Sequence, residues 1–128
     1  SDQAIDRVYK PEGLHNATTS LLVVENTHNQ GCGRVLGVDE VQRIVKKARA
    51  LDLRAHCDGA RLWNAAIADG ESLTDLARPF DFVSVAFSKG LGAPGGSLVA
   101  GSRAHIARAI RMRTSGKVRP PELGCWPP

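Results

Sequence analysis

The feature that most constrains the fold is the alternation of short, continuously apolar segments with segments of helical periodicity. "LLVVEN" (residues 21–26) is an apolar run typical of a strand buried on both faces. From Asp39 to about Leu51, apolar residues recur every three or four positions between charges, which predicts an amphipathic helix with Asp39 as its N-cap. Because such a helix needs a sheet to cover, the alternation favours helices packed on a sheet.

The following strand separates its side chains by kind. In "LRAHCDGAR" (residues 53–61), alternate residues of an extended chain share a face, which predicts a polar face of Arg54, His56 and Asp58. The remaining expected elements are helices over 62–68 and 72–77, strands over 81–87 and 97–100, and a helix capped by Ser102 with an apolar row of Ile106 and Ile110.

This order of elements predicts an α/β architecture with a mainly parallel sheet and helical crossovers. In such sheets, ligands bind beyond the carboxyl ends of the strands. Three polar motifs fall there: "ENTHN" (25–29), "DGAR" (58–61) and "SKG" (88–90). The sequence therefore places its candidate chemistry at one edge of the sheet.

The composition is that of one soluble globular domain or part of one, with 128 residues, 42% hydrophobic and 23% charged. The net charge of +4 is concentrated beyond residue 102, where six basic residues accompany one acidic residue. A solvated basic face on the last helix explains this excess better than nucleic-acid binding does. No apolar window approaches the ~18 residues that span a bilayer. We therefore expect neither a nucleic acid nor a membrane as a partner.

The cysteines, Cys32, Cys57 and Cys125, are odd in number and widely separated. This favours a reducing compartment, and we expect a cytoplasmic location. Together with the nearby histidines they lack the spacing of metal ligands, so no metal site is expected. The sequence starts at Ser1 without a visible leader, and we expect the natural start to be absent.

Lys89 is a lone charge between an apolar strand and the glycine-rich stretch "GLGAPGG". An ammonium group is costly to bury, so the side chain either reaches water or is used chemically. A lysine that forms a Schiff base must shed its proton, which desolvation or a neighbouring cation favours. A solvated lysine in a turn is the other interpretation.

Asp58 and Arg61 bracket a glycine turn at the end of a predicted strand. A carboxylate beside the pyridine nitrogen of pyridoxal phosphate keeps that nitrogen protonated, and Asp58 is a candidate for this role. Alternatively, Asp58 accepts backbone N–H groups in the Gly59 turn. Arg61 could bind the cofactor or a substrate carboxylate, or have a structural role.

Three segments, in this order and at this spacing, resemble the low-specificity threonine aldolases, which are pyridoxal-phosphate lyases of the aspartate-aminotransferase fold class. The segments are "ENTHNQGCGRVL", "HCDGARLWNAAIADG" and "VSVAFSKGLGAPGGSLVAGSR". The resemblance runs from about Leu21 to Arg113 and implies the central part of the large domain of a fold-type I enzyme. We expect a connecting segment over 1–19, a partial cofactor-binding domain over 20–114 and an irregular Pro-rich tail over 115–128.

The resemblance also implies roles for individual residues. Lys89 matches the Schiff-base lysine, Asp58 the partner of the pyridine nitrogen, and Arg61 an arginine that contacts the cofactor. The implied reaction cleaves threonine or allo-threonine, a small β-hydroxy-α-amino acid, to glycine and acetaldehyde. The family further implies a homo-oligomer in the full-length form.

Three further residues have two interpretations each. His28 either touches the ligand or holds its loop, His56 either orients Asp58 or is a packed, hydrogen-bonded histidine, and Asn26 either binds the cofactor ring or closes a strand. Because family chains are longer, with sections expected before Ser1 and beyond the last helix, an inactive truncated remnant with an interaction role is the alternative to an active lyase.

Overall fold

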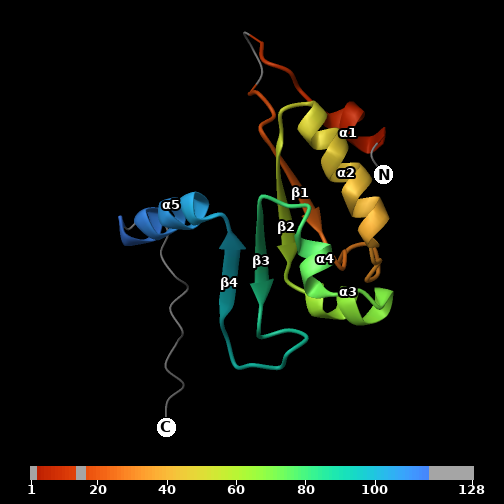
Figure 1. Ribbon diagram of the computed structural model, residues 1–128, viewed down its shortest axis with the longest axis vertical. Coiled ribbons are helices and arrows are strands. Elements are labelled where there is room, and N and C mark those ends of the chain that lie inside the picture. The colour runs from red at the N-terminus through yellow and green to blue at the C-terminus, as the bar shows by residue number, and fades with distance from the viewer. Residues whose placement is uncertain (1–2, 14–16, 116–128) are drawn as a thin grey trace.

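The computed structural model describes residues 3–13 and 17–115. These residues form a four-stranded sheet in the order β1 (Leu21–Glu25), β2 (Arg54–Gly59), β3 (Phe82–Ala86) and β4 (Ser97–Gly101). β1, β2 and β3 pair in parallel, and β4 returns antiparallel to β3. The arrows in Figure 1 show this reversal at β4. The mainly parallel sheet is confirmed, with a hairpin joining its last two strands.

Helices form the crossovers between the parallel strands. α2 (Val38–Ala50) connects β1 to β2, and α3 (Leu62–Asp69) with α4 (Leu73–Ala77) connects β2 to β3. α5 (Arg103–Thr114) follows β4, and α1 (Gln3–Val8) lies within the segment expected to be a connection. None of these helices, in the ranges described, has the length and apolarity required to cross a bilayer.

The hydrophobic core lies on one face of the sheet. The strands contribute Val24, Ala55, Cys57 and Val83, each at most 7% exposed. The helices contribute the residues that pack against them, chiefly Val41, Ile44, Val45 and Ala48 of α2, Leu62 and Ala65 of α3, and Leu76 of α4. In Figure 1, α1 to α4 gather on the side of β1, whereas α5 stands apart beyond β4. One layer of helices therefore covers this face of the sheet.

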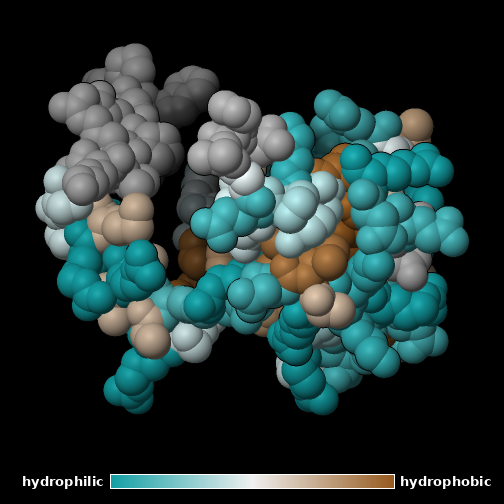
Figure 2. Space-filling model, turned by 90° about the horizontal axis from the view of Figure 1, so that it is seen from above, coloured by the Kyte–Doolittle hydropathy of each residue, from teal (hydrophilic) through white to brown (hydrophobic). Residues whose placement is uncertain are grey.

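The expectation that β1 is buried on both faces is wrong. Val24 is 7% exposed, whereas its neighbour Val23 is 53% exposed and Leu21 is 41% exposed. The reason is that α2 packs over one face of the strand, and no element of the described chain covers Val23 on the other. Figure 2 shows apolar surface exposed among the hydrophilic side chains.

Asp39 is not the N-cap of α2. The cap position belongs to Gly37, whose extended backbone makes no side-chain capping bond and whose carbonyl accepts from the Val41 N–H at 3.0 Å. Asp39 lies instead in the first turn, where its negative charge favours the helix dipole. The predicted cap of α5 is confirmed, since Ser102 Oγ accepts from the His105 N–H at 3.3 Å. No residue of α5 is buried, and Ile110 of its predicted apolar row is 49% exposed.

Candidate active site

The three polar motifs lie at one edge of the sheet, as the sequence predicts. β1, β2 and β3 are parallel, so their carboxyl ends lie together, and Asp58 pairs in register with Glu25 on one side and Ser84 on the other. Lys89 follows three residues after the end of β3. Loops from three parts of the sequence thus come together beyond these strand ends, beside α3 in Figure 1.

Asp58 is half-buried and lies on the open face of β2, since its neighbours Cys57 and Gly59 are the buried ones. Its Oδ1 accepts a hydrogen bond from the Ala60 N–H at 3.2 Å, which is the turn role expected as one alternative. Among the hydrogen bonds of the described residues, none involves the other carboxylate oxygen. The turn therefore uses only one of the two carboxylate oxygens of Asp58.

Arg61 follows the glycine turn and is the N-cap residue of α3. Its Nη1 lies 3.5 Å from Oε1 of Glu25, and both side chains are about one-third exposed, at 30% and 29%. The same Glu25 oxygen accepts from the Asn29 N–H at 3.2 Å. The sequence analysis missed Glu25, although its register beside Asp58 follows from two parallel strands that end together.

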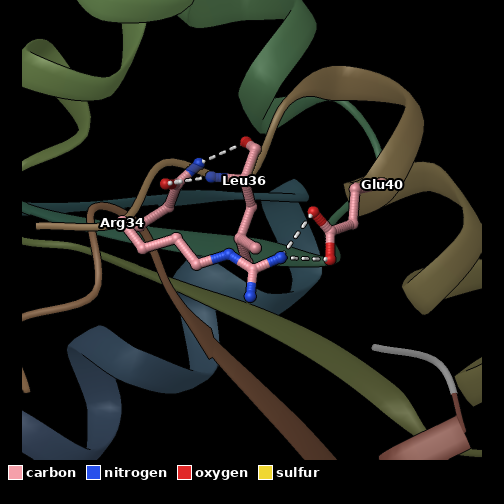
Figure 3. A network of polar contacts seen from close by, with 4 residues as sticks. Arg34, Leu36 and Glu40 are labelled. Atoms are coloured by element: carbon pink, nitrogen blue, oxygen red, sulfur yellow. Dashed lines mark hydrogen bonds and ion pairs between the residues drawn. The ribbon is translucent and has the colours of Figure 1, made fainter. Parts of the chain in front are cut away.

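Asn26 is 2% exposed and binds the backbone across its own loop. Its Nδ2 donates to the Leu36 carbonyl at 2.9 Å, and its Oδ1 accepts from the Leu36 N–H at 3.1 Å. Dashed lines in Figure 3 mark this pair of bonds beside the ion pair of Arg34 with Glu40. These contacts favour the strand-closing interpretation of Asn26.

His28 belongs to the same loop and binds it chiefly through its backbone. Its N–H donates to the Arg34 carbonyl and its carbonyl accepts from the Gly33 N–H, both at 2.9 Å. Its side chain is 48% exposed, with Nε2 3.9 Å from Oε2 of Glu25. These contacts favour a loop-holding role for His28.

His56 is packed and hydrogen-bonded on the open face, two residues before Asp58. Its ring stacks on Phe82 with centroids 4.7 Å apart, and its Nε2 lies 3.1 Å from Ser84 Oγ. Burial lowers the pKa of His56 below its usual value of 6.5, against the opposing effect of the Asp58 charge. The lowered pKa favours the neutral ring, and the contacts with Phe82 and Ser84 favour the packed, hydrogen-bonded interpretation of His56.

Cys57 points to the opposite, covered face and is 0% exposed. Burial, and secondly the Asp58 charge, raises the pKa of its thiol to about 12. Because the thiolate is the reactive form, this cysteine is inert at neutral pH. Its place in the site region is structural.

Lys89 is exposed in the loop between β3 and β4. The loop is closed where the Phe87 N–H donates to the Gly96 carbonyl at 3.0 Å, and the Lys89 carbonyl accepts from the Gly92 N–H at 3.0 Å. Gly92 and Gly96 adopt φ of 65° and 109°, which favour glycine. No ion pair of the described residues involves Lys89, and its exposure in the loop matches the solvated-lysine interpretation rather than the desolvated one.

The donor set fits pyridoxal phosphate. An amine, a partly unengaged carboxylate and a guanidinium match the carbonyl, the ring nitrogen and the anionic groups of that cofactor.

A groove of about 370 Å³ lies away from Lys89 and Asp58, between α5 and the open face of the sheet. It is lined in part by Phe82, Val99 and His105. Among the described residues, no group of three or more His, Cys, Asp or Glu is arranged to hold a metal ion.

The architecture matches part of the large domain of fold-type I pyridoxal-phosphate enzymes. A solved structure from Listeria monocytogenes, provisionally named an L-allo-threonine aldolase, superposes with a TM-score of 0.70 at 28% identity, covering 80% of this chain and 29% of that one. The chain belongs to the beta-eliminating lyase family, whose model matches residues 2–117.

Curated relatives point to the same group of enzymes. A low specificity L-threonine aldolase of Escherichia coli O157:H7 is 44% identical over 112 residues, covering 86% of this chain and 33% of the relative. A low-specificity L-threonine aldolase of Candida albicans is 38% identical over 114 residues, covering 87% and 30%. The resemblance read from the three motifs is thus confirmed, and the chain spans about a third of the length of these relatives.

Proposed function

We propose that this chain is the cofactor-binding core of a pyridoxal-phosphate lyase of the threonine aldolase type, which cleaves threonine or allo-threonine to glycine and acetaldehyde. The observation that carries the proposal is that "DGAR" and "SKG" both lie at the carboxyl ends of neighbouring parallel strands. Ligands of open α/β sheets bind at such edges. In the full-length protein we propose a homo-oligomer.

Each side chain has a separate task in this proposal. With the cofactor bound, Lys89 would hold it through its amine, Asp58 would keep a proton on the ring nitrogen, and Arg61 would bind an anionic group of cofactor or substrate. When bound, pyridoxal phosphate supplies a ring that accepts the electrons left at Cα as the Cα–Cβ bond breaks. His56 supports the strand beside Asp58, and Asn26 and His28 hold the neighbouring loop.

The open face favours a second candidate, an inactive remnant with an interaction role. Val23 is 53% exposed and Val99 is 51% exposed on the face that carries Asp58. Exposed apolar patches mark surfaces that bind other protein segments. In this alternative the chain keeps the fold and docks on a full-length relative without turnover.

The test is covalent trapping of the cofactor. The 128-residue chain is incubated with pyridoxal phosphate, reduced with borohydride and digested, and mass spectrometry locates the reduced adduct. We expect the adduct at Lys89, its loss in Lys89→Gln and its retention in Lys46→Gln, because Lys46 is an exposed lysine of α2 away from this edge. Adduct distributed over surface lysines would contradict the proposal.

Turnover separates the two candidates. The same chain is incubated with threonine and pyridoxal phosphate, and glycine and acetaldehyde are measured. Their formation, lost in Lys89→Gln, supports the lyase and excludes the inactive remnant. An adduct at Lys89 without either product supports the remnant.

A further inference from the structure

Glu25 joins three parts of the candidate site: the end of β1, the loop that follows β1, and the start of α3. One of its carboxylate oxygens lies 3.5 Å from Arg61 Nη1 and accepts from the Asn29 N–H at 3.2 Å. The other lies 3.9 Å from His28 Nε2. A single side chain at the end of β1 therefore contacts both the start of α3 and the loop that follows its own strand.

The register places Glu25 beside a second acidic side chain. Glu25 pairs directly with Asp58 across parallel strands, so two acidic side chains leave the same face side by side. Like charges in this arrangement are destabilising. The Arg61 guanidinium beside Glu25 offsets that repulsion and leaves Asp58 bonded through one oxygen to the Ala60 N–H.

Arg61 needs a fixed partner in order to be useful to a ligand. An arginine side chain has several rotatable bonds, and ordering it at the moment of binding weakens affinity. The Arg61 side chain is 30% exposed, and Glu25 is its ion-pair partner among the described residues. A guanidinium already held by Glu25 avoids much of that ordering cost.

We infer that Glu25 is a positioning residue that holds the Arg61 guanidinium at the carboxyl edge of the sheet. Its consequence for cofactor affinity rests on the function proposed above, in which Arg61 binds an anionic group. Removal of the Glu25 charge has two opposing effects: Arg61 becomes free to move, and its positive charge is less neutralised. The lost order of the Arg61 side chain outweighs its gain in uncompensated charge.

The variants isolate this contact. Glu25→Gln keeps an oxygen that can accept from the Asn29 N–H but removes the charge that pairs with Arg61. The matched control is Glu40→Gln, because Glu40 pairs with Arg34 of the same loop at 3.2 Å and has a similarly exposed side chain, 24% against 29% for Glu25. Both variants remove one carboxylate from an ion pair, but only one of these pairs holds Arg61.

The first measurement needs no cofactor. Nitrogen-15 NMR of the arginine guanidinium groups reports how freely each one rotates. We expect Glu25→Gln to speed the rotation of the Arg61 group and Glu40→Gln to leave it unchanged. An Arg61 signal that does not respond to Glu25→Gln overturns the inference, whatever the cofactor does.

The second measurement is a double-mutant cycle on pyridoxal phosphate affinity. We expect Glu25→Gln to weaken binding about threefold to fivefold, as for a partly exposed ion pair, and to have no effect in an Arg61→Gln background. A tighter complex, or an equal loss in both backgrounds, overturns the inference. If the wild-type chain binds no cofactor while Arg61 still responds to Glu25→Gln, the proposed function fails and the positioning role of Glu25 stands.

Discussion

The two faces of the sheet are made by alternate residues of the same strands, yet they differ in almost every respect. On the covered face, Cys57 is 0% exposed and Val24 is 7% exposed beneath α2. On the open face, their immediate neighbours are His56 and Asp58 on β2, and Val23, 53% exposed, on β1. The alternation of a strand thus separates the residues that stabilise the fold from those that carry its candidate chemistry.

The difference also governs what each titratable group can do. The Cys57 thiol on the covered face has a pKa raised to about 12 by burial and stays protonated. Polar groups on the open face bind each other, as His56 Nε2 does with Ser84 Oγ at 3.1 Å and Arg54 Nη1 with His105 Nε2 at 2.9 Å. These contacts link side chains of neighbouring strands and of α5 on the open face.

The largest expected effect is the difference in stability between the same truncation made on the covered face and on the open face. Leu76→Ala removes a side chain that is 1% exposed in the core, and we expect it to lower the free energy of unfolding by about 2–5 kcal/mol. Leu21→Ala removes the same atoms from a side chain that is 41% exposed on β1, and we expect a loss of less than about 1 kcal/mol. Urea unfolding followed by circular dichroism measures both. Equal losses would show that the open face is packed in solution.

A smaller effect is expected at Gly59, where α3 approaches the sheet closely. A Cβ there would lie 2.8 Å from the Ser84 carbonyl oxygen and 3.1 Å from Leu62 Cβ. Because the nearer neighbour is a backbone atom, Gly59→Ala forces β3 or α3 to move. We expect the free energy of unfolding to fall by about 1–3 kcal/mol. Gly13→Ala is the control, since a Cβ at Gly13 meets none of the described residues within 4 Å. A neutral Gly59→Ala in urea unfolding would mean that α3 is loosely seated.

Local patterns predict most of the fold because they record burial on the covered face. The three- and four-residue spacing from Val41 to Ala48 predicts α2 within a residue or two of its bounds, Val38–Ala50. The period of two in 53–59 predicts which side chains of β2 share a face. Both patterns arise from the hydrophobic core between the helices and the covered face of the sheet.

What the sequence did not predict depends on partners distant in the chain. The apolar run at 21–24 indicates hydrophobicity on both faces but not whether an element covers the second one, so the exposure of Val23 was missed. Glu25 was missed because its importance comes from register with Asp58 and from Arg61, which is 36 residues away in sequence. The strand-end location of the motifs was predictable from topology, whereas the roles of Lys89, Asp58 and Arg61 remain predictions.

The smallest expected effect is a pH dependence that originates on the open face. Burial lowers the pKa of His56 in the folded chain, while the unfolded chain keeps a value near 6.5. As the pH falls below that value, the unfolded state therefore takes up a proton first, and the free energy of unfolding decreases until the folded pKa is also passed.

Urea midpoints at about pH 7.5 and about pH 5.5 measure this slope, since the interval spans the ordinary pKa of histidine. We expect His56→Gln to reduce the loss of stability on acidification, because glutamine does not titrate. His28→Gln is the control and retains the loss, because it leaves the His56 ring in place on Phe82. If His56→Gln leaves the slope intact, the ring is more hydrated than its stacking on Phe82 implies, and the open face is looser than its polar contacts suggest.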